Sequence, residues 1–129
     1  MDHPETIFEE LKSDSFDPLA LWERVNGDMD LLRDLVGLFA QEYPGLLSNI
    51  EAAIQQGSFT DLQRFSHKLK GSALQFSGRQ AVAVAGALEK MGATNSLESA
   101  DQLFLKLKHE VLYLMKVLNA MIGLERPLV

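Results

Sequence analysis

The sequence lacks cysteine entirely and has no apolar run long enough to cross a membrane. Without cysteine there is no disulfide, no thiolate zinc site and no cysteine nucleophile, which is consistent with a reducing cytoplasm. The longest strongly apolar stretch, residues 81–88, is far shorter than the ~20 residues that span a bilayer. The acidic N-terminal residues MDHPETIFEELK do not resemble a secretion signal. We therefore expect a cytoplasmic protein that does not associate with a membrane.

Basic residues are in the minority, since 12 Lys and Arg stand against 18 Asp and Glu, a formal net charge of −6. This balance argues against a nucleic-acid partner or an anionic membrane surface, because both require a basic face. The chain has 129 residues, of which 47% are hydrophobic, enough to form a core. We expect a single domain over residues 1–129.

Motifs for enzymatic sites are missing as well. The sequence has no glycine-rich phosphate loop with its lysine, no nucleophile-elbow serine and no dinucleotide fingerprint. A metal site would require His3, His67 and His109 to converge, and no short metal-ligand spacing supports that arrangement. We therefore expect neither an ATP site nor a metal or other cofactor belonging to this chain.

The sequence does contain helical patterning, without the period-two alternation of strands. Asp17 before Pro18, and Asp28, are typical helix N-caps, and Ser58 with Asp61 is typical of a capping box. Four long amphipathic helices with short connections predict an all-α fold, an antiparallel up-down four-helix bundle, with one or two short N-terminal helices covering one end. The expected helices span residues 4–13, 18–25, 28–56, 58–76 and 79–91, with a last helix from Asn95 or Ser96 to about residue 123.

Pro44 lies inside the predicted helix 28–56 and either kinks that helix or divides it in two. We favour a kink, because the apolar spacing resumes without a turn signal. Gly57 and Gly92 are expected to end their helices. The predicted buried face of helix 28–56 consists of Leu31, Leu32, Leu35, Leu38, Phe39, Leu46, Leu47, Ile50, Ala53 and Ile54, and that of the last helix of Leu103, Leu107, Val111, Leu114, Leu118 and Met121.

The helix over residues 58–76 carries a histidine on its outer face. At about 100° per residue, His67 lies roughly 200° from both Phe65 and Leu69, two residues of the inward stripe, and therefore points to solvent. The full inward stripe is predicted to be Leu62, Phe65, Leu69, Ala73 and Phe76, and the side of His67 to carry Gln63, Arg64, Lys70, Gly71 and Leu74.

Gly71 and Leu74 are unusual residues for an exposed helix face. A glycine in a helix middle costs about 1 kcal/mol relative to alanine, and core packing does not demand it here. Leu74 places an apolar side chain where a polar one is expected. A gap beside an imidazole, with a cation and an apolar contact nearby, predicts a docking site for a partner protein, formed by Gln63, Arg64, Gly71 and Leu74.

His67 has the chemistry of a phosphoryl acceptor. An imidazole has an ordinary pKa of about 6.5, so its neutral form is available at neutral pH as a nucleophile. Lys70, one turn away, should attract incoming phosphoryl oxygens and disfavour the charged ring, while Gly71 leaves room for the group. Phosphoryl transfer needs positioning and charge neutralisation more than further covalent machinery.

The run HKLKGSA at residues 67–73 resembles the His-x-Leu-Lys-Gly-Ser motif of histidine-containing phosphotransfer (HPt) domains. Gly78, the ALE segment at residues 87–89, and the long Phe- and Pro-containing helix followed by Gly-Ser are similar to that family too. The resemblance covers about residues 19–121. It implies that His67 is the phosphoacceptor, through Nε2, that Lys70 supports the phosphohistidine, and that Gly71 provides clearance. Arg79 departs from the family pattern, in which many members have a small residue after the glycine.

The resemblance also implies partners for a monomeric carrier in a two-component phosphorelay. Such a domain accepts a phosphoryl group from a receiver-domain aspartate or a histidine kinase and passes it to a response regulator receiver domain, whose Mg²⁺ belongs to the receiver. Two other interpretations remain open. One is a helical adaptor that binds a receiver or kinase through the Leu74 face without carrying phosphate. The other is a hydrolytic or metal-dependent bundle enzyme, which would need convergent acids or ligands.

Overall fold

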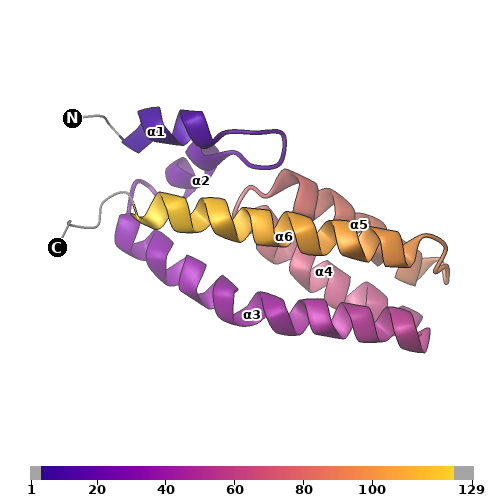
Figure 1. The fold of residues 1–129 in the computed structure, drawn as a ribbon. Coiled ribbons are helices and arrows are strands. Elements are labelled where there is room, and N and C mark those ends of the chain that lie inside the picture. The colour runs from indigo at the N-terminus through magenta and orange to yellow at the C-terminus, as the bar shows by residue number, and fades with distance from the viewer. Residues whose placement is uncertain (1–3, 124–129) are drawn as a thin grey trace.

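The computed structural model describes residues 4–123, which form six helices and, within that range, no strand (Figure 1). In chain order these are α1 (Pro4–Leu11), α2 (Pro18–Arg24), α3 (Met29–Gln56), α4 (Phe59–Gln75), α5 (Arg79–Ala93) and α6 (Ala100–Gly123). Helix α4 packs against α3 and α5, and α6 closes the bundle by packing against both α5 and α3. The predicted all-α four-helix bundle is confirmed. None of the helices in residues 4–123 has the length and apolar character needed to cross a membrane.

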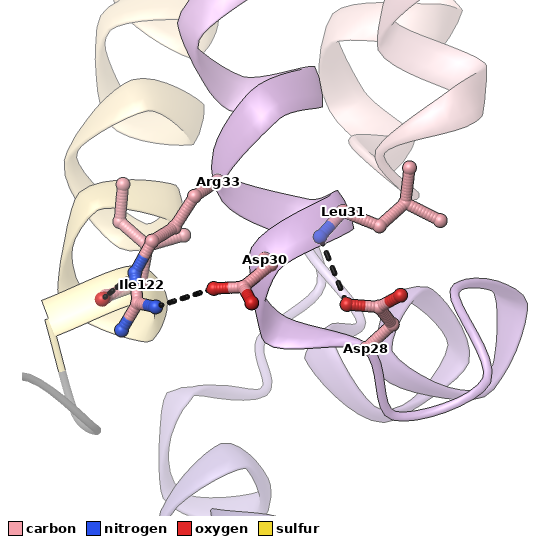
Figure 2. Close-up of polar contacts among 5 residues, drawn as sticks. All are labelled: Asp28, Asp30, Leu31, Arg33 and Ile122. Carbon is pink, nitrogen blue, oxygen red and sulfur yellow. Dashed lines mark hydrogen bonds and ion pairs between the residues drawn. The ribbon is translucent and has the colours of Figure 1, made fainter.

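Both predicted aspartate caps are confirmed. The Asp17 carboxylate accepts a hydrogen bond from the backbone N–H of Ala20 at 3.2 Å and begins α2. The Asp28 carboxylate accepts from the N–H of Leu31 at 3.0 Å and begins α3 (Figure 2). Each bond satisfies an N–H that has no partner inside its own helix, which explains why these helices begin where they do.

The predicted capping box at the start of α4 is wrong. Ser58 does occupy the N-cap position, but its side chain makes no cap hydrogen bond. The carboxylate of Asp61 instead accepts a hydrogen bond from Arg64 one turn further along α4, at 3.3 Å. Asp61 lies in the first turn of α4, where a negative charge interacts favourably with the helix dipole. Its carboxylate is paired with Arg64 on the surface and does not cap the helix.

Helix α3 continues through Pro44 without a break, and its axis bends near the middle (Figure 1). The kink that the sequence favoured over two separate helices is therefore confirmed. Gly57 ends α3 in the left-handed backbone conformation with φ of +70°, which glycine adopts without strain.

Gly92 does not end its helix, because α5 continues to Ala93. A Cβ atom at Gly92 would lie 2.5 Å from the backbone nitrogen of Gln63 and 2.7 Å from the carbonyl oxygen of Phe59. Glycine is therefore required here by the close approach of α5 to α4, and not by a turn. The sequence pattern does not distinguish these two causes.

The start of the last helix was predicted four or five residues too early. Asn95 and Ser99 have positive φ values of 54° and 64°, so the chain between them turns instead of continuing as a helix. Leu97, which lies between them, packs against the core. Helix α6 begins only at Ala100.

Several predicted core positions differ from those observed. Leu31 and Leu38 are 43% and 62% exposed, because the buried side of α3 passes through Met29, Val36 and their neighbours. Leu35, Phe65 and Leu103 are only partly buried, while Ser66, not predicted to face inward, is fully buried. The other predicted core residues are buried, namely Leu32, Phe39, Leu46, Leu47, Ile50, Ala53, Ile54, Leu62, Leu69, Ala73, Phe76, Leu107, Val111, Leu114, Leu118 and Met121.

Helices α1 and α2 lie at the end of the bundle where α3 begins and α6 ends (Figure 1). Phe8 of α1 is fully buried and packs edge-on against Trp22 of α2, with ring centroids 5.3 Å apart. The Arg24 guanidinium donates to the carbonyl of Leu74 at 2.8 Å and so attaches α2 to the last turn of α4. Arg79, the departure from the family pattern, forms an ion pair with Asp17 at 2.8 Å across the same junction.

A polar contact joins the first and last helices of the bundle at that end. Arg33 of α3 donates from Nε to the carbonyl of Ile122 at 3.3 Å and from Nη1 to Asp30 at 3.3 Å (Figure 2). The guanidinium thereby satisfies a carbonyl in the last turn of α6, where carbonyls lack partners within the helix. This contact helps to set the register of α3 against α6.

Candidate functional site

His67 lies in the middle of α4, with its side chain 67% exposed. Leu62, Leu69 and Ala73 on the opposite side of α4 are fully buried. The imidazole is therefore carried on the outer surface of a helix that is held on both sides by α3 and α5. A ring in this position is accessible to another protein while its backbone remains rigid.

Glu89 of α5 is the direct partner of the imidazole. Its Oε2 lies 2.5 Å from Nδ1 of His67, and its Oε1 accepts a hydrogen bond from Nζ of Lys70 at 2.5 Å. The hydrogen bond from Lys70 is the largest cause lowering the pKa of Glu89 below its ordinary value, and the bond from His67 adds to it, although partial burial opposes both. Glu89 is therefore ionised at neutral pH.

An ionised carboxylate only accepts hydrogen bonds, so Nδ1 of His67 must be the donor in this contact. The neutral ring then has its hydrogen on Nδ1 and its lone pair on Nε2. Glu89 thus selects the tautomer in which the nitrogen farther from α5 is free to react. In the cationic ring, the same carboxylate offsets the positive charge.

Lys70 does not stand beside the ring as an isolated cation. Its side chain is one-third exposed and extends across α5, where a Cβ atom at Gly86 would lie 3.6 Å from the Lys70 Cδ. The lysine stem thus passes at van der Waals distance over Gly86 to reach Glu89. The predicted effect of Lys70 on the charge of the ring is therefore offset by the carboxylate that both groups share.

A surface hollow of about 450 Å³ lies beside the imidazole, toward the N-terminal end of α4. Side chains on a helix lean toward its N-terminus, so the ring of His67 lies over the preceding turn. The hollow therefore forms there and not over Gly71. Its lining consists of Thr60, Gln63, Arg64, His67, Lys68 and Glu89.

The other predicted docking residues lie further along α4. A Cβ atom at Gly71 would meet nothing within 4 Å, and Leu74 is 59% exposed. Next to them, a smaller groove of about 130 Å³ lies between α3 and α4, with the 62% exposed Leu38 on its rim. The lining of this groove is Leu35, Leu38, Phe39, Glu42, Ser72, Gln75 and Phe76. Gln63 and Arg64 thus lie on one side of His67, and Gly71 and Leu74 on the other.

Sequence reasoning assigned no role to Glu89, although the family resemblance included it. The available signal was that Glu89 is the only acidic residue in α5, a helix otherwise rich in small and apolar residues. Its distance from His67 is decided by how α4 and α5 pack. Of the other histidines, His109 is exposed on α6, and His3 lies outside the described residues. No cluster of metal-ligating side chains occurs among the described residues.

The fold and the site together define a helical bundle that presents a hydrogen-bonded, solvent-accessible imidazole. A family model described as Hpt domain matches residues 34–119, more than half of the chain. The chain therefore belongs to the Hpt domain family, whose members carry a phosphoryl group on histidine within phosphorelays, with response regulators and kinases as partner classes. Hpt domains act as carriers and are not enzymes with an ATP site of their own. No curated protein and no solved structure matches the chain.

Proposed function

We propose that Nε2 of His67 is the phosphoacceptor of this Hpt domain. The observation that carries the proposal is the contact between Nδ1 and the ionised Glu89, which leaves the Nε2 lone pair free on an exposed ring. The domain accepts the group from a receiver aspartate or a histidine kinase and passes it to the receiver domain of a response regulator. His67 is the only described histidine that combines exposure with a carboxylate partner.

In the proposed step, the Nε2 lone pair attacks the phosphorus of an aspartyl phosphate. A bond forms between Nε2 and phosphorus, while the bond from phosphorus to the aspartate oxygen breaks, and the bonding pair stays on the aspartate carboxylate. The ring keeps its proton on Nδ1 and becomes cationic as the bond forms. Glu89 stabilises this developing charge, because its carboxylate is already in contact with that proton. Transfer to the next receiver is the same reaction in reverse.

Lys70 contributes by holding Glu89 in place and by supplying positive charge close to the phosphoryl oxygens. Its ammonium contacts Glu89, and the Lys70 side chain as a whole is one-third exposed, so a phosphoryl group on His67 can attract it further. The Mg²⁺ that neutralises the transferring group is expected to come from the receiver. Nothing in the proposed role of this chain requires a metal ligand of its own.

The receiver is proposed to dock across α3 and α4, beside His67. Gly71 leaves the middle of this face open, and Leu38 and Leu74 supply exposed apolar surface next to a groove. Arg64 and Gln63 complete the face on the other side of the ring. A central open position with apolar contacts around it suits a docking interface in which the receiver's aspartate approaches Nε2.

The direct test is incubation with a phosphorylated receiver domain, followed by acid and base treatment of the labelled protein. We expect a label that is lost in acid and survives base, as phosphohistidine does, and we expect His67→Gln to abolish it. His109→Gln is the matched control, because it removes the other exposed imidazole among the described residues. Labelling of His67→Gln at the wild-type level would defeat the assignment.

The same experiment separates the carrier from a helical adaptor. An adaptor would bind the receiver with equal affinity before and after the His67→Gln change and would never become labelled. For that reason the affinity for the unphosphorylated receiver should be measured beside the labelling. Binding without any label in the wild-type protein would favour the adaptor.

A further inference from the structure

The hollow beside His67 is lined by two cationic side chains, Arg64 and Lys68. Arg64 is three residues before His67 on α4, a spacing at which side chains are neighbours on one helix face. The imidazole leans toward this turn, as helical side chains do. Gly71, on the other side of the ring, does not line the hollow.

Arg64 is held loosely. Its guanidinium donates to Asp61 at 3.3 Å, and the two side chains are 59% and 44% exposed. It also lies over the ring of Phe65, with its central carbon 4.5 Å from the ring centroid. An exposed ion pair of this kind contributes little, so exchanging Asp61 for a stronger anion requires little free energy.

Lys70 is committed to a different partner. Its ammonium bonds to Glu89, which is only 20% exposed, and that carboxylate also holds His67. Moving Lys70 fully onto a phosphoryl group would therefore disturb the contact that selects the tautomer of the ring. A planar guanidinium suits phosphoryl oxygens better than an ammonium, because it donates two parallel hydrogen bonds.

We propose that the hollow formed by Thr60, Gln63 and Arg64 is the phosphoryl-binding pocket of phosphorylated His67, and that Arg64 leaves Asp61 to bind the phosphoryl oxygens. The inference rests on the proposed function and assigns Arg64 a role beyond docking. Glu89 accepts the hydrogen bond from Nδ1 of the ring, while Arg64 binds the phosphoryl group on Nε2. Asp61 is a positioning residue that keeps the guanidinium near the hollow until the group arrives.

The test measures the equilibrium constant for phosphoryl exchange between a receiver domain and this chain, together with the Kd for the unphosphorylated receiver. For Arg64→Gln we expect the exchange equilibrium to shift about fivefold or more toward the phosphorylated receiver, because charge-assisted hydrogen bonds to phosphohistidine are lost. The Kd should change by a smaller factor than the exchange equilibrium, because Arg64 is only one residue at the edge of the proposed docking face. Asp61→Asn should shift the exchange the opposite way, by about twofold, because it releases Arg64.

Two further variants distinguish a specific ligand from general charge. Lys90→Gln, on the exposed surface beside Glu89, removes the same charge without reaching the hollow and should leave the exchange unchanged. Arg64→Lys should restore only part of the shift. An Arg64→Gln protein with an unchanged equilibrium overturns the inference, and so does a shift in Lys90→Gln as large as that in Arg64→Gln.

Docking and phosphoryl binding are also separable. An Arg64→Gln protein whose Kd rises while its exchange equilibrium stays at the wild-type value would make Arg64 a docking residue only and overturn the inference. If wild-type His67 accepts no label, the proposed function and this inference both fail. If wild-type His67 is labelled and Arg64→Gln behaves like wild type, only this inference fails.

Discussion

Two exposed histidines on two helices of the same bundle differ in almost everything except exposure. His67 on α4 bonds through Nδ1 to Glu89 of the neighbouring helix and opens onto a hollow of about 450 Å³. His109 on α6 makes no side-chain hydrogen bond with any part of the chain that the structure describes. A groove between α3 and α6 lies close to His109 in sequence, because Lys108 and Leu112 line it. His109 itself does not line this groove.

The sequence around the two histidines is less different than their surroundings in space. Each has a lysine three residues away along its helix, Lys70 and Lys106, and an exposed leucine further along. What His109 lacks is a carboxylate delivered from a second helix and a hollow beside its ring. The two imidazoles therefore differ in what the adjacent helix supplies, and mutations at the two surfaces can test whether this difference makes His67 the phosphoacceptor.

Among changes that keep the imidazole of His67, the largest effect is expected from closing the open position beside it. Gly71→Leu should raise the Kd for a receiver at least about tenfold, a loss of ~1.4 kcal/mol, because the side chain fills the docking face. The same change should stabilise the fold by up to about 1 kcal/mol, since leucine is the better helix former. Titration calorimetry and thermal unfolding measure the two quantities. Ala120→Leu on α6 is the control, and equal binding by both variants would show that clearance at Gly71 is unimportant.

The next largest effect is expected from removing the negative charge of Glu89, the partner of His67. Glu89→Gln should slow phosphoryl acceptance about tenfold, because the amide no longer enforces a hydrogen on Nδ1 or offsets the cationic ring. Glu110→Gln, beside His109, removes the same charge and should leave the rate unchanged. Rapid-quench measurement of label transfer from a phosphorylated receiver gives both rates. A wild-type rate for Glu89→Gln would remove the main difference between the two histidines.

A smaller effect is expected from Lys70. Lys70→Ala should slow transfer or shorten the lifetime of the phosphohistidine by up to about fivefold, because a one-third exposed charge is screened by solvent. The fold should remain intact, as judged by circular dichroism and thermal unfolding. Lys106→Ala tests the equivalent lysine near His109. The same loss in both variants would point to net charge and not to a local role.

The smallest effect is on stability in acid. Because the folded protein lowers the pKa of Glu89, its contribution to stability is fully present above the ordinary glutamate pKa of about 4.3. The contribution is then lost as the pH falls through the lowered pKa. Glu89→Gln should therefore be slightly less stable than wild type at pH 7, by a few tenths of a kcal/mol, and the difference should shrink as the pH falls through the lowered pKa of Glu89. A difference that grows in acid would contradict this sign.

Much of the fold was predictable from local patterns. The aspartates at positions 17 and 28 and the glycine at position 57 identified helix ends correctly, because caps act through bonds within four residues. The outward direction of His67 followed from the buried stripe of its own helix. The prediction was wrong where a glycine can be required for either of two reasons. Gly92 was expected to end α5, but it is required for the close contact between α5 and α4.

Packing between helices could not be predicted in the same way. Leu38 was placed in the core by its spacing, yet the rotation of α3 leaves it 62% exposed next to α4. Ser66 is fully buried because the close approach of α5 places that side of α4 inside the bundle. Both outcomes depend on how one helix is rotated against another, which short-range periodicity leaves open.

The sequence alone determined that this chain forms a helical bundle and that one imidazole with a nearby lysine faces outward, since periodicity and caps act within single helices. Only the tertiary structure decided which nitrogen of that imidazole is free and where its hollow lies. Glu89 is 22 residues from His67 along the chain, and the two meet only because Gly92 lets α5 approach α4 closely. That contact depends on the register between two helices, which no local pattern specifies.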